Sequence, residues 1–320
     1  MNEAEAIERL RKFATDPAAR GLADDAALFD GLVITHDTIA EGVHFRTGDP
    51  AASVAWKLVA VNLSDLAAKG ATPAAALLSL TIGKSGGWDA AFIDGIEAAC
   101  STFDIALIGG DTIALPTGAP RVFGLTAIGR AAKHTPSRSG AKPGDRLWLL
   151  GTVGDSAAGL AQLKYDPAAG GLLVEAYRRP VPLLAGGRAL APKAHAMMDV
   201  SDGLLLDARR LAQASGCGLT IDLDALPLSE AFIAERGNGL DARLFAATGG
   251  DDYALLAALH ARLDPLRLSL PCGTSICCIG TFDAGSDPLR IVSNGKPVTL
   301  PETLGHEHHG NSASPVASRA

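Results

Sequence analysis

The chain is poor in cysteine and in aromatic residues. No apolar run approaches the ~18 residues of a membrane span, and the acidic N-terminus lacks the basic and apolar regions of a signal peptide. The few cysteines form no C-x-x-C pair and are typical of reduced core residues in a cytoplasmic protein. They are Cys100, Cys217, Cys272, Cys277 and Cys278. We therefore expect a cytoplasmic protein without a membrane partner.

Basic residues are also too sparse to form a binding stripe. Lys and Arg total 28 against 35 Asp and Glu, so the formal net charge is -7. Because the basic residues are scattered, we expect no nucleic-acid partner. A length of 320 residues with 48% hydrophobic and 20% charged residues is typical of a globular protein with room for two domains. An acidic protein that binds phosphorylated small molecules would need cations as intermediaries.

Apolar periodicity predicts a mixed fold of the α/β (α+β) class. In the first part of the chain it predicts helices at 3–14, 49–70 and 88–103, and strands at 26–29, 32–35, 74–82, 105–108 and 122–128. In the second part it predicts helices at 156–163, 183–190 and 204–214, and strands at 146–150, 194–198, 219–223, 253–259, 276–282 and 289–292.

A connection rich in Pro, Gly, Ser and basic residues separates these two parts at 131–145. We therefore expect an N-terminal domain at 1–140 and a C-terminal domain at 141–309. The small, polar tail at 310–320 is predicted to be disordered.

Short acidic turns are the most informative pattern in the chain. Two carboxylates about 4 Å apart repel by roughly 4 kcal/mol at an effective dielectric near 20, so gathering several requires a cation. Magnesium prefers oxygen ligands and bridges carboxylates to substrate phosphates, which predicts a phosphate-handling enzyme. Asp is also a common turn former and helix N-cap, so each turn alone is ambiguous. The six are Asp24-Asp25, Asp37, Asp65, Gly109-Gly110-Asp111, Asp199-Val200-Ser201-Asp202 and Gly249-Gly250-Asp251-Asp252.

Three short motifs match known sites only in part. Gly83-Lys84-Ser85 resembles the end of a Walker loop but lacks the first glycine. Asp222-Leu223-Asp224 begins like an EF-hand, and Leu226-Pro227 breaks the ligand pattern. The run His306-Glu307-His308-His309 could bind zinc, but no second cluster accompanies it, so a polar tail is the favoured interpretation.

Other motifs follow one another in order over nearly the whole chain. They are GLADDAA at 21–27, EGVHF at 41–45, Lys57 with VNLSDLAA at 61–68, GGDT at 109–112, RSGAKPGD at 138–145, GDSAAGL at 154–160, DVSDGL at 199–204 and GGDDY at 249–253. Together they resemble the thiamine-monophosphate kinase family. The resemblance implies the two-domain fold of the aminoimidazole-ribonucleotide synthetase superfamily, with N-terminal domains pairing into a dimeric β-barrel. It also implies ATP-dependent phosphorylation of thiamine monophosphate to thiamine diphosphate with several magnesium ions.

The same resemblance implies roles for individual residues. The metal ligands would be Asp25, Thr35, His36, Asp37, Asp65, Asp111, Asp199 and Asp202. Contacts to ATP would come from Gly110, Asp111, Arg138 and Ser201, and contacts to thiamine monophosphate from His44, Asp251 and His309. Three positions depart from the family pattern: His36 replaces a Ser or Thr, Asp251 a glutamate and His309 an aromatic residue.

Phosphoryl transfer to a phosphate acceptor requires no general base, because a phosphate monoester with a second pKa of about 6 is already ionised. We expect Asp65 to bridge more than one ion and Asp199 and Asp202 to join Asp25 in a cluster between the domains. The alternatives are another ATP-dependent enzyme of the superfamily, either a purine-pathway cyclase or a selenophosphate synthetase, and a non-catalytic metal-binding module. The first cysteine is Cys100, which disfavours selenophosphate synthetase with its reactive cysteine near the N-terminus.

Overall fold

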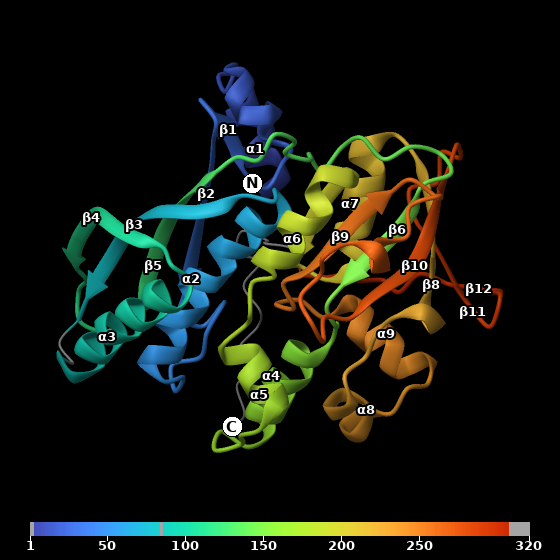
Figure 1. Cartoon of the computed structure of the whole chain (residues 1–320). Coiled ribbons are helices and arrows are strands. Elements are labelled where there is room, and N and C mark those ends of the chain that lie inside the picture. Colours follow the sequence, from blue (N-terminus) through green and yellow to red (C-terminus); the bar gives the residue numbers. More distant parts are fainter. Residues whose placement is uncertain (1–2, 84–85, 307–320) are drawn as a thin grey trace.

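A computed structural model describes residues 3–83 and 86–306 and contains two α/β halves, each built on one β-sheet (Figure 1). The sequence-predicted tail at 310–320, His309 and all but His306 of the histidine run lie outside the described residues. None of the described helices is long and apolar enough to cross a membrane.

The N-terminal half has a five-stranded sheet with the order β1-β2-β5-β3-β4. All pairs are antiparallel except β3 and β4, which are parallel and are joined through helix α3. Apolar side chains of α2 and α3, including Leu58, Phe92 and Ile96, pack against Phe123 and Leu125 of β5. The elements, with η for a short 3-10 helix, are α1 (Glu3–Arg11), η1 (Pro17–Leu22), β1 (Ala27–Phe29), β2 (Leu32–Ala40), α2 (Ala51–Ala68), β3 (Thr72–Ile82), α3 (Gly86–Thr102), β4 (Ala106–Ala114) and β5 (Val122–Arg130).

The C-terminal half has a seven-stranded sheet with the order β12-β11-β8-β10-β6-β9-β7. Its strands are β6 (Arg146–Leu150), β7 (Ala194–Val200), β8 (Gly218–Asp222), β9 (Ala254–Leu259), β10 (Ile276–Asp283), β11 (Arg290–Ser293) and β12 (Lys296–Val298). Its helices are α4 (Asp155–Tyr165), α5 (Leu172–Arg178), α6 (Leu184–Leu190), α7 (Leu204–Ser215), α8 (Glu230–Arg236) and α9 (Leu240–Thr248), with short turns η2 (Ala191–Lys193), η3 (Leu223–Ala225) and η4 (Pro265–Arg267).

Helix α2 lies between the two halves, and nearly all of its side chains are buried (Figure 1). Most apolar side chains of α2 belong to the core of the N-terminal half, while Ala67 and Ala68 at its C-terminal end belong to the core formed by β6, β7 and β9. The halves approach closely here, because a Cβ added at Gly187 of α6 would lie 2.1 Å from the Ala67 carbonyl oxygen. Buried polar groups must find partners within the protein. The polar residues of α2 are therefore constrained to face specific groups in both halves.

The prediction for strand 105–108 was wrong at its end. Gly109-Gly110-Asp111 was expected to form a turn, but β4 continues through these residues to Ala114. The partner strand β3 is long enough to pair with all of them, and Leu78 lies opposite Gly110. A Cβ at Gly110 would lie 1.9 Å from the Leu78 carbonyl oxygen, so glycine permits this close pairing. Helices α5, α8 and α9 were not predicted, because none has a long apolar stripe.

Candidate active site

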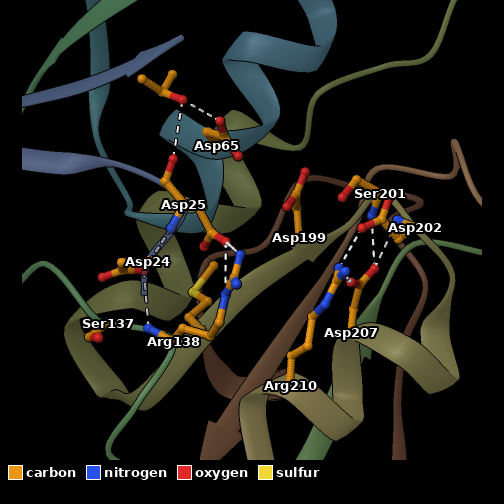
Figure 2. Close-up of polar contacts among 12 residues, drawn as sticks. Asp24, Asp25, Asp65, Ser137, Arg138, Asp199, Ser201, Asp202, Asp207 and Arg210 are labelled. Atoms are coloured by element: carbon orange, nitrogen blue, oxygen red, sulfur yellow. Dashed lines mark hydrogen bonds and ion pairs between the residues drawn. The ribbon is translucent and has the colours of Figure 1, made fainter. Parts of the chain in front are cut away.

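Three of the predicted metal ligands come together where the halves meet. Oxygen atoms of Asp25, Asp65 and Asp199 all lie within 4.8 Å of one another (Figure 2). Asp25 precedes β1, Asp65 lies in the last turn of α2, and Asp199 lies near the end of β7. The cluster therefore takes two carboxylates from the N-terminal half and one from the C-terminal half.

Asp65 and Asp199 lack a direct cationic partner among the described contacts. Burial, followed by the charges of neighbouring carboxylates, raises the pKa of Asp65 well above its usual value. Burial and the charge of Asp25 do the same for the pKa of Asp199. Hydroxyl groups stabilise both: Thr35 donates a hydrogen bond to Asp65, and Ser64 Oγ donates to Asp199 Oδ2 over 2.7 Å. These hydrogen bonds hold both carboxyl groups in place, while ionising either group in this buried position remains unfavourable.

Asp25 is the opposite case, because two cations surround it. Burial alone would raise its pKa, but Lys69 and Arg138 outweigh that effect and lower the pKa of Asp25 to about 2. Lys69 Nζ lies 2.6 Å from Asp25 Oδ2, and Arg138 Nε donates to Asp25 Oδ1 over 3.2 Å. Asp25 is therefore ionised throughout the neutral pH range.

Lys69 contacts the acidic cluster but was not among the predicted site residues. Its side chain is fully buried, and Nζ also contacts Asp24 Oδ1 at 2.5 Å and the Met197 carbonyl oxygen at 3.0 Å. It thus connects the turn before β1 to strand β7 of the other half. The only sequence signal is a lysine directly after an apolar helix, which is also where a solvated helix-terminal lysine would lie.

Asp37 also faces this cluster. Burial and the charges of Asp25 and Asp202 raise the pKa of Asp37 to about 6. The Asp37 main-chain N–H donates to Asn62 Oδ1 over 2.9 Å, and Asn62 Nδ2 donates to the Leu58 carbonyl oxygen over 2.9 Å. Asn62 therefore fixes β2 against α2 at the position where both elements deliver a carboxylate.

Ser201 and Asp202 lie in the loop between β7 and α7. Asp207 Oδ2 accepts the main-chain N–H groups of Ser201, Asp202 and Gly203 over 3.1, 3.0 and 3.2 Å (Figure 2). Arg210 forms ion pairs with Asp202 and, at 3.0 Å, with Asp207 Oδ1. Burial raises the pKa of Asp207 to about 7. The acidic loop is thus held by a carboxylate and a guanidinium that were not among the predicted site residues.

A second polar group surrounds Lys57, which lies in α2 eight residues before Asp65. Lys57 Nζ lies 2.7 Å from Asp251 Oδ2 and donates to the His44 carbonyl oxygen over 3.0 Å. Tyr253 donates from its hydroxyl to Asp251 Oδ1 over 2.9 Å, and His44 Nδ1 accepts the Ala40 N–H over 3.1 Å. His44 and Asp251, which lie 207 positions apart in the printed sequence, therefore share one lysine.

One cleft of about 720 Å³ joins the acidic cluster to this second group. Its walls come from both halves, from α1 and from the N-terminal turn of α4. The predicted site residues that line it are Asp25, Asp37, His44, Asp65, Arg138, Asp199, Ser201, Asp202 and Asp251. A compartment of this size with carboxylates at one end and guanidinium groups beside them can hold a cation together with phosphate groups.

Other predicted residues lie elsewhere. Thr35 is buried behind Asp65. The imidazole of His36 lies on the opposite face of β2, where Nδ1 is 2.9 Å from Thr126 Oγ1. Gly110 and Asp111 lie on β4, an exposed edge strand, and do not line the cleft. Alternation along a strand separates His36 from its neighbours Thr35 and Asp37, so its side chain does not face the cluster.

Two family models match the chain. Residues 23–131 match the N-terminal domain of AIR synthase related proteins, and residues 142–261 match their C-terminal domain. The gap between the two matches, 132–141, lies within the predicted connection at 131–145. Together they cover more than half of the chain, with all strands of the N-terminal sheet and strands β6, β7, β8 and β9 of the C-terminal sheet.

Curated relatives and solved structures agree with this assignment. The chain is 38% identical to the thiamine-monophosphate kinase of Salmonella typhimurium, covering 94% of this chain and 95% of that protein. It is 39% identical to the thiamine-monophosphate kinase of Caulobacter vibrioides, covering 92% and 86%. A solved structure described as AaThiL complexed with AMPPCP and TMP has a TM-score of 0.82 at 28% identity, covering 96% and 97%. The thiamine-monophosphate kinase structure from Stenotrophomonas maltophilia has a TM-score of 0.73 at 36% identity, covering 92% and 96%.

Proposed function

This chain belongs to the thiamine-monophosphate kinase family of AIR synthase related proteins, and on that premise we propose how its cleft performs the family reaction. It transfers the γ-phosphoryl group of ATP to thiamine monophosphate and forms thiamine diphosphate and ADP. The observation that carries this conclusion is the buried group of carboxylates from both halves, lining a cleft large enough for two phosphorylated substrates. A neighbour with the same fold over 96% of this chain is described as complexed with AMPPCP and TMP.

We propose that Mg²⁺ ions bind at the acidic cluster. Burial and neighbouring carboxylates raise the pKa of both Asp65 and Asp199, and their described hydrogen-bond donors are hydroxyl groups. Such a group fits a hard cation with oxygen ligands. Ions bound there would neutralise the phosphate charge that develops during transfer. The proposed ligand set is Asp25, Asp37, Asp65, Asp199 and Asp202, with Asp65 serving more than one ion. Of the other ligands that the resemblance implies, Thr35 lies behind Asp65, and the side chains of His36 and Asp111 do not line the cleft.

The chain's own residues position the reactants. Arg138 is fixed by Asp25 and Arg210 by Asp202 and Asp207, so two guanidinium groups lie preorganised beside the acidic cluster. We propose that Arg138 and Ser201 contact ATP and that His44 and Asp251 contact thiamine monophosphate, since all four line the cleft. Gly110 and Asp111, which the resemblance also assigns to ATP, lie on β4 outside the cleft, and His309 lies outside the described residues. No general base is needed, because the acceptor phosphate is already ionised near neutral pH. The reaction is then a direct in-line transfer, favoured by positioning.

We also propose a cytoplasmic homodimer, with domains at 1–140 and 141–309. Within the described residues the N-terminal sheet does not close on itself, and its edge strand β4 is exposed along its whole length. Exposed edge strands invite pairing with another chain. A two-fold axis beside β4 would join two such sheets. Pairing of this kind would form the dimeric β-barrel expected from the resemblance.

An acceptor panel tests the proposed function. Purified protein with ATP and Mg²⁺ is given thiamine monophosphate, thiamine, or the phosphorylated intermediates of purine synthesis, and ADP and phosphorylated products are quantified. We expect thiamine monophosphate to be the only acceptor that reacts, and we expect it to give ADP and thiamine diphosphate in equal amounts. Turnover with a purine intermediate would instead favour the cyclase relatives. Metal binding without any ATP turnover would favour a non-catalytic module.

A further inference from the structure

Lys57 is buried deep in α2, with 2% of its side chain exposed. Burying an ammonium group is costly unless charge and hydrogen bonds compensate it. Three groups surround Nζ: the Asp251 carboxylate, the His44 carbonyl oxygen and the face of the Tyr177 ring, whose centroid is 4.2 Å away. Each partner comes from a different segment of the chain. Lys57 therefore has a specific set of contacts that a buried apolar residue could not make.

Lys57 does not itself line the cleft, whereas two of its partners do. Asp251 keeps 26% of its side chain exposed. His44 lies in the turn after β2, where its N–H donates to the Ala40 carbonyl oxygen over 2.9 Å. The ammonium group thus lies behind the cleft wall and holds an acidic side chain from one half beside a turn from the other half.

The segment around Asp251 needs such support. Asp251 and Tyr253 both adopt positive φ angles, 68° and 53°, which residues other than glycine rarely adopt. Main-chain bonds hold the segment to the acidic loop, since the Asp251 N–H donates to the Ser201 carbonyl oxygen over 2.7 Å and the Tyr253 N–H to Val200 over 2.8 Å. The position of the Asp251 carboxylate is then completed by Lys57 and the Tyr253 hydroxyl.

The aromatic partner is itself fixed. Tyr177 donates from its hydroxyl to Asp49 Oδ2 over 3.1 Å, and Arg178 Nε donates to Asp49 Oδ1 over 3.1 Å. Asp49 is buried just before α2. The ring therefore presents a fixed face to the ammonium group, which a cation–π contact favours. All three partners of Lys57 are also held by hydrogen bonds to other groups, so the site that the ammonium group occupies has a fixed geometry.

We propose that Lys57 is a positioning residue for the acceptor, because it fixes Asp251 and the His44 turn as the wall that binds the part of thiamine monophosphate remote from the reacting phosphate. The inference rests on the proposed function. Its consequence is selective. Without Lys57, Asp251 and the His44 turn lose their shared anchor, so acceptor binding weakens, while the contacts that hold Asp25, Asp65 and Asp199 do not involve Lys57 and remain.

The test compares wild type, Lys57→Met, Asp251→Asn and the double variant in steady-state assays varied in each substrate separately. Lys57→Gln, which keeps a hydrogen-bond donor, repeats the measurement should the methionine variant fold poorly. Lys57→Met should raise KM for thiamine monophosphate about tenfold or more, the size expected for one hydrogen bond to a charged group. KM for ATP should change less than about threefold. The exposed Lys296→Met serves as the matched control and should leave all constants unchanged.

The double variant separates positioning from mere stability. If Lys57 acts through Asp251, its substitution should add little to KM in the Asp251→Asn background. Independent effects that multiply, or equal losses toward both substrates together with a lowered Tm, would overturn the inference. A wild-type protein that forms no thiamine diphosphate would instead refute the proposed function. The two failures are therefore distinguishable, and the thermal shift produced by thiamine monophosphate alone gives a binding readout that needs no turnover.

Discussion

Lys69 Nζ lies 2.6 Å from Asp25 Oδ2, and neither side chain has more than 2% of its surface exposed. A protein cation thus already occupies one side of the proposed metal site. It keeps Asp25 ionised without metal and ties the turn before β1 to β7 through Met197. The neighbouring Asp65 and Asp199 receive no such ion pair among the described residues. The negative charge of the acidic cluster is therefore neutralised at Asp25 and remains costly at Asp65 and Asp199.

Removing the cation should destabilise the protein. Lys69→Met leaves Asp24 and Asp25 buried with only their arginine partners, and breaking a buried pair typically costs about 3–5 kcal/mol. We expect a clear loss in the free energy of unfolding, measured by urea denaturation in the presence of chelator. Lys296→Met, at an exposed position, should leave the free energy of unfolding nearly unchanged. Equal stability of the two variants would show that Lys69 does not neutralise the aspartates.

Asp65 should be indispensable for turnover. Asp65→Asn keeps the size of the side chain but removes its charge. Losing a residue that only supports a metal ligand already costs about 10- to 100-fold, so losing a bridging ligand should reduce kcat by at least about 100-fold. The fold should survive, because the substitution also relieves repulsion in a buried cluster. Activity within threefold of wild type at saturating Mg²⁺ would remove Asp65 from the ligand set.

Magnesium should stabilise the protein more at pH 7.5 than at pH 5. The pKa of Asp37 is raised from 3.8 to about 6, so the folded protein binds a proton there more tightly than the unfolded chain does. Its contribution to stability without metal is therefore lost as pH rises from about 4 to about 6. Mg²⁺ must displace that proton at pH 5 but not at pH 7.5.

Differential scanning fluorimetry with and without Mg²⁺ measures this difference in Tm. The Asp37→Asn variant is the control and should lose part of the pH dependence, since it has no titrating group at this position. An identical Mg²⁺-induced shift at both pH values in the wild type would exclude Asp37 from the metal site.

The edge strand β4 should mediate dimerisation. Ile108 is 62% exposed there, and a glutamate would place a charge in the middle of a sheet-to-sheet contact. We expect Ile108→Glu to sediment as a monomer where the wild type sediments as a dimer. Tyr165→Glu is the matched control, because Tyr165 is 94% exposed on α4 and should leave the dimer intact. A monomeric wild type at micromolar concentration would refute the assembly.

His44 should distinguish the two substrates. Replacing it by alanine removes a proposed contact to the acceptor, which should raise KM for thiamine monophosphate and leave KM for ATP nearly unchanged. Initial rates varied in each substrate separately provide the measurement. A defect toward ATP alone would return His44 to a structural role in its turn, where its Nδ1 already accepts the Ala40 N–H.

Sequence patterns predicted most of the long elements, because α3 and α7 carry apolar stripes, α2 is a long and largely apolar segment, and the strands carry continuous apolar runs. They failed at β4, where pairing with β3 overrides the turn preference of Gly109-Gly110-Asp111. Local periodicity contains no information about that distant partner. The short helices α5, α8 and α9 depend on packing rather than on propensity, so they were missed as well.

The sequence predicted the site only where the type of a residue by itself indicates a chemical role. Paired aspartates indicated a cation site, and the structure brings Asp25, Asp65 and Asp199 together. The buried lysines were not predictable, because Lys57 meets Asp251 across 194 positions and Lys69 meets Asp24 across 45. A lysine within an apolar helix gives no sign of whether it snorkels to solvent or pairs inside. That choice depends on tertiary contacts.

The most direct test of the central claim follows the terminal phosphate. The protein is incubated with Mg²⁺, thiamine monophosphate and ATP that carries radiolabel in its γ-phosphate, and both products and protein are separated after denaturation. Direct transfer at the acidic cluster predicts that the label appears in the terminal phosphate of thiamine diphosphate, with none retained on the protein, and that Asp65→Asn abolishes it. Label bound covalently to the protein, or released as inorganic phosphate independently of thiamine monophosphate, would contradict it.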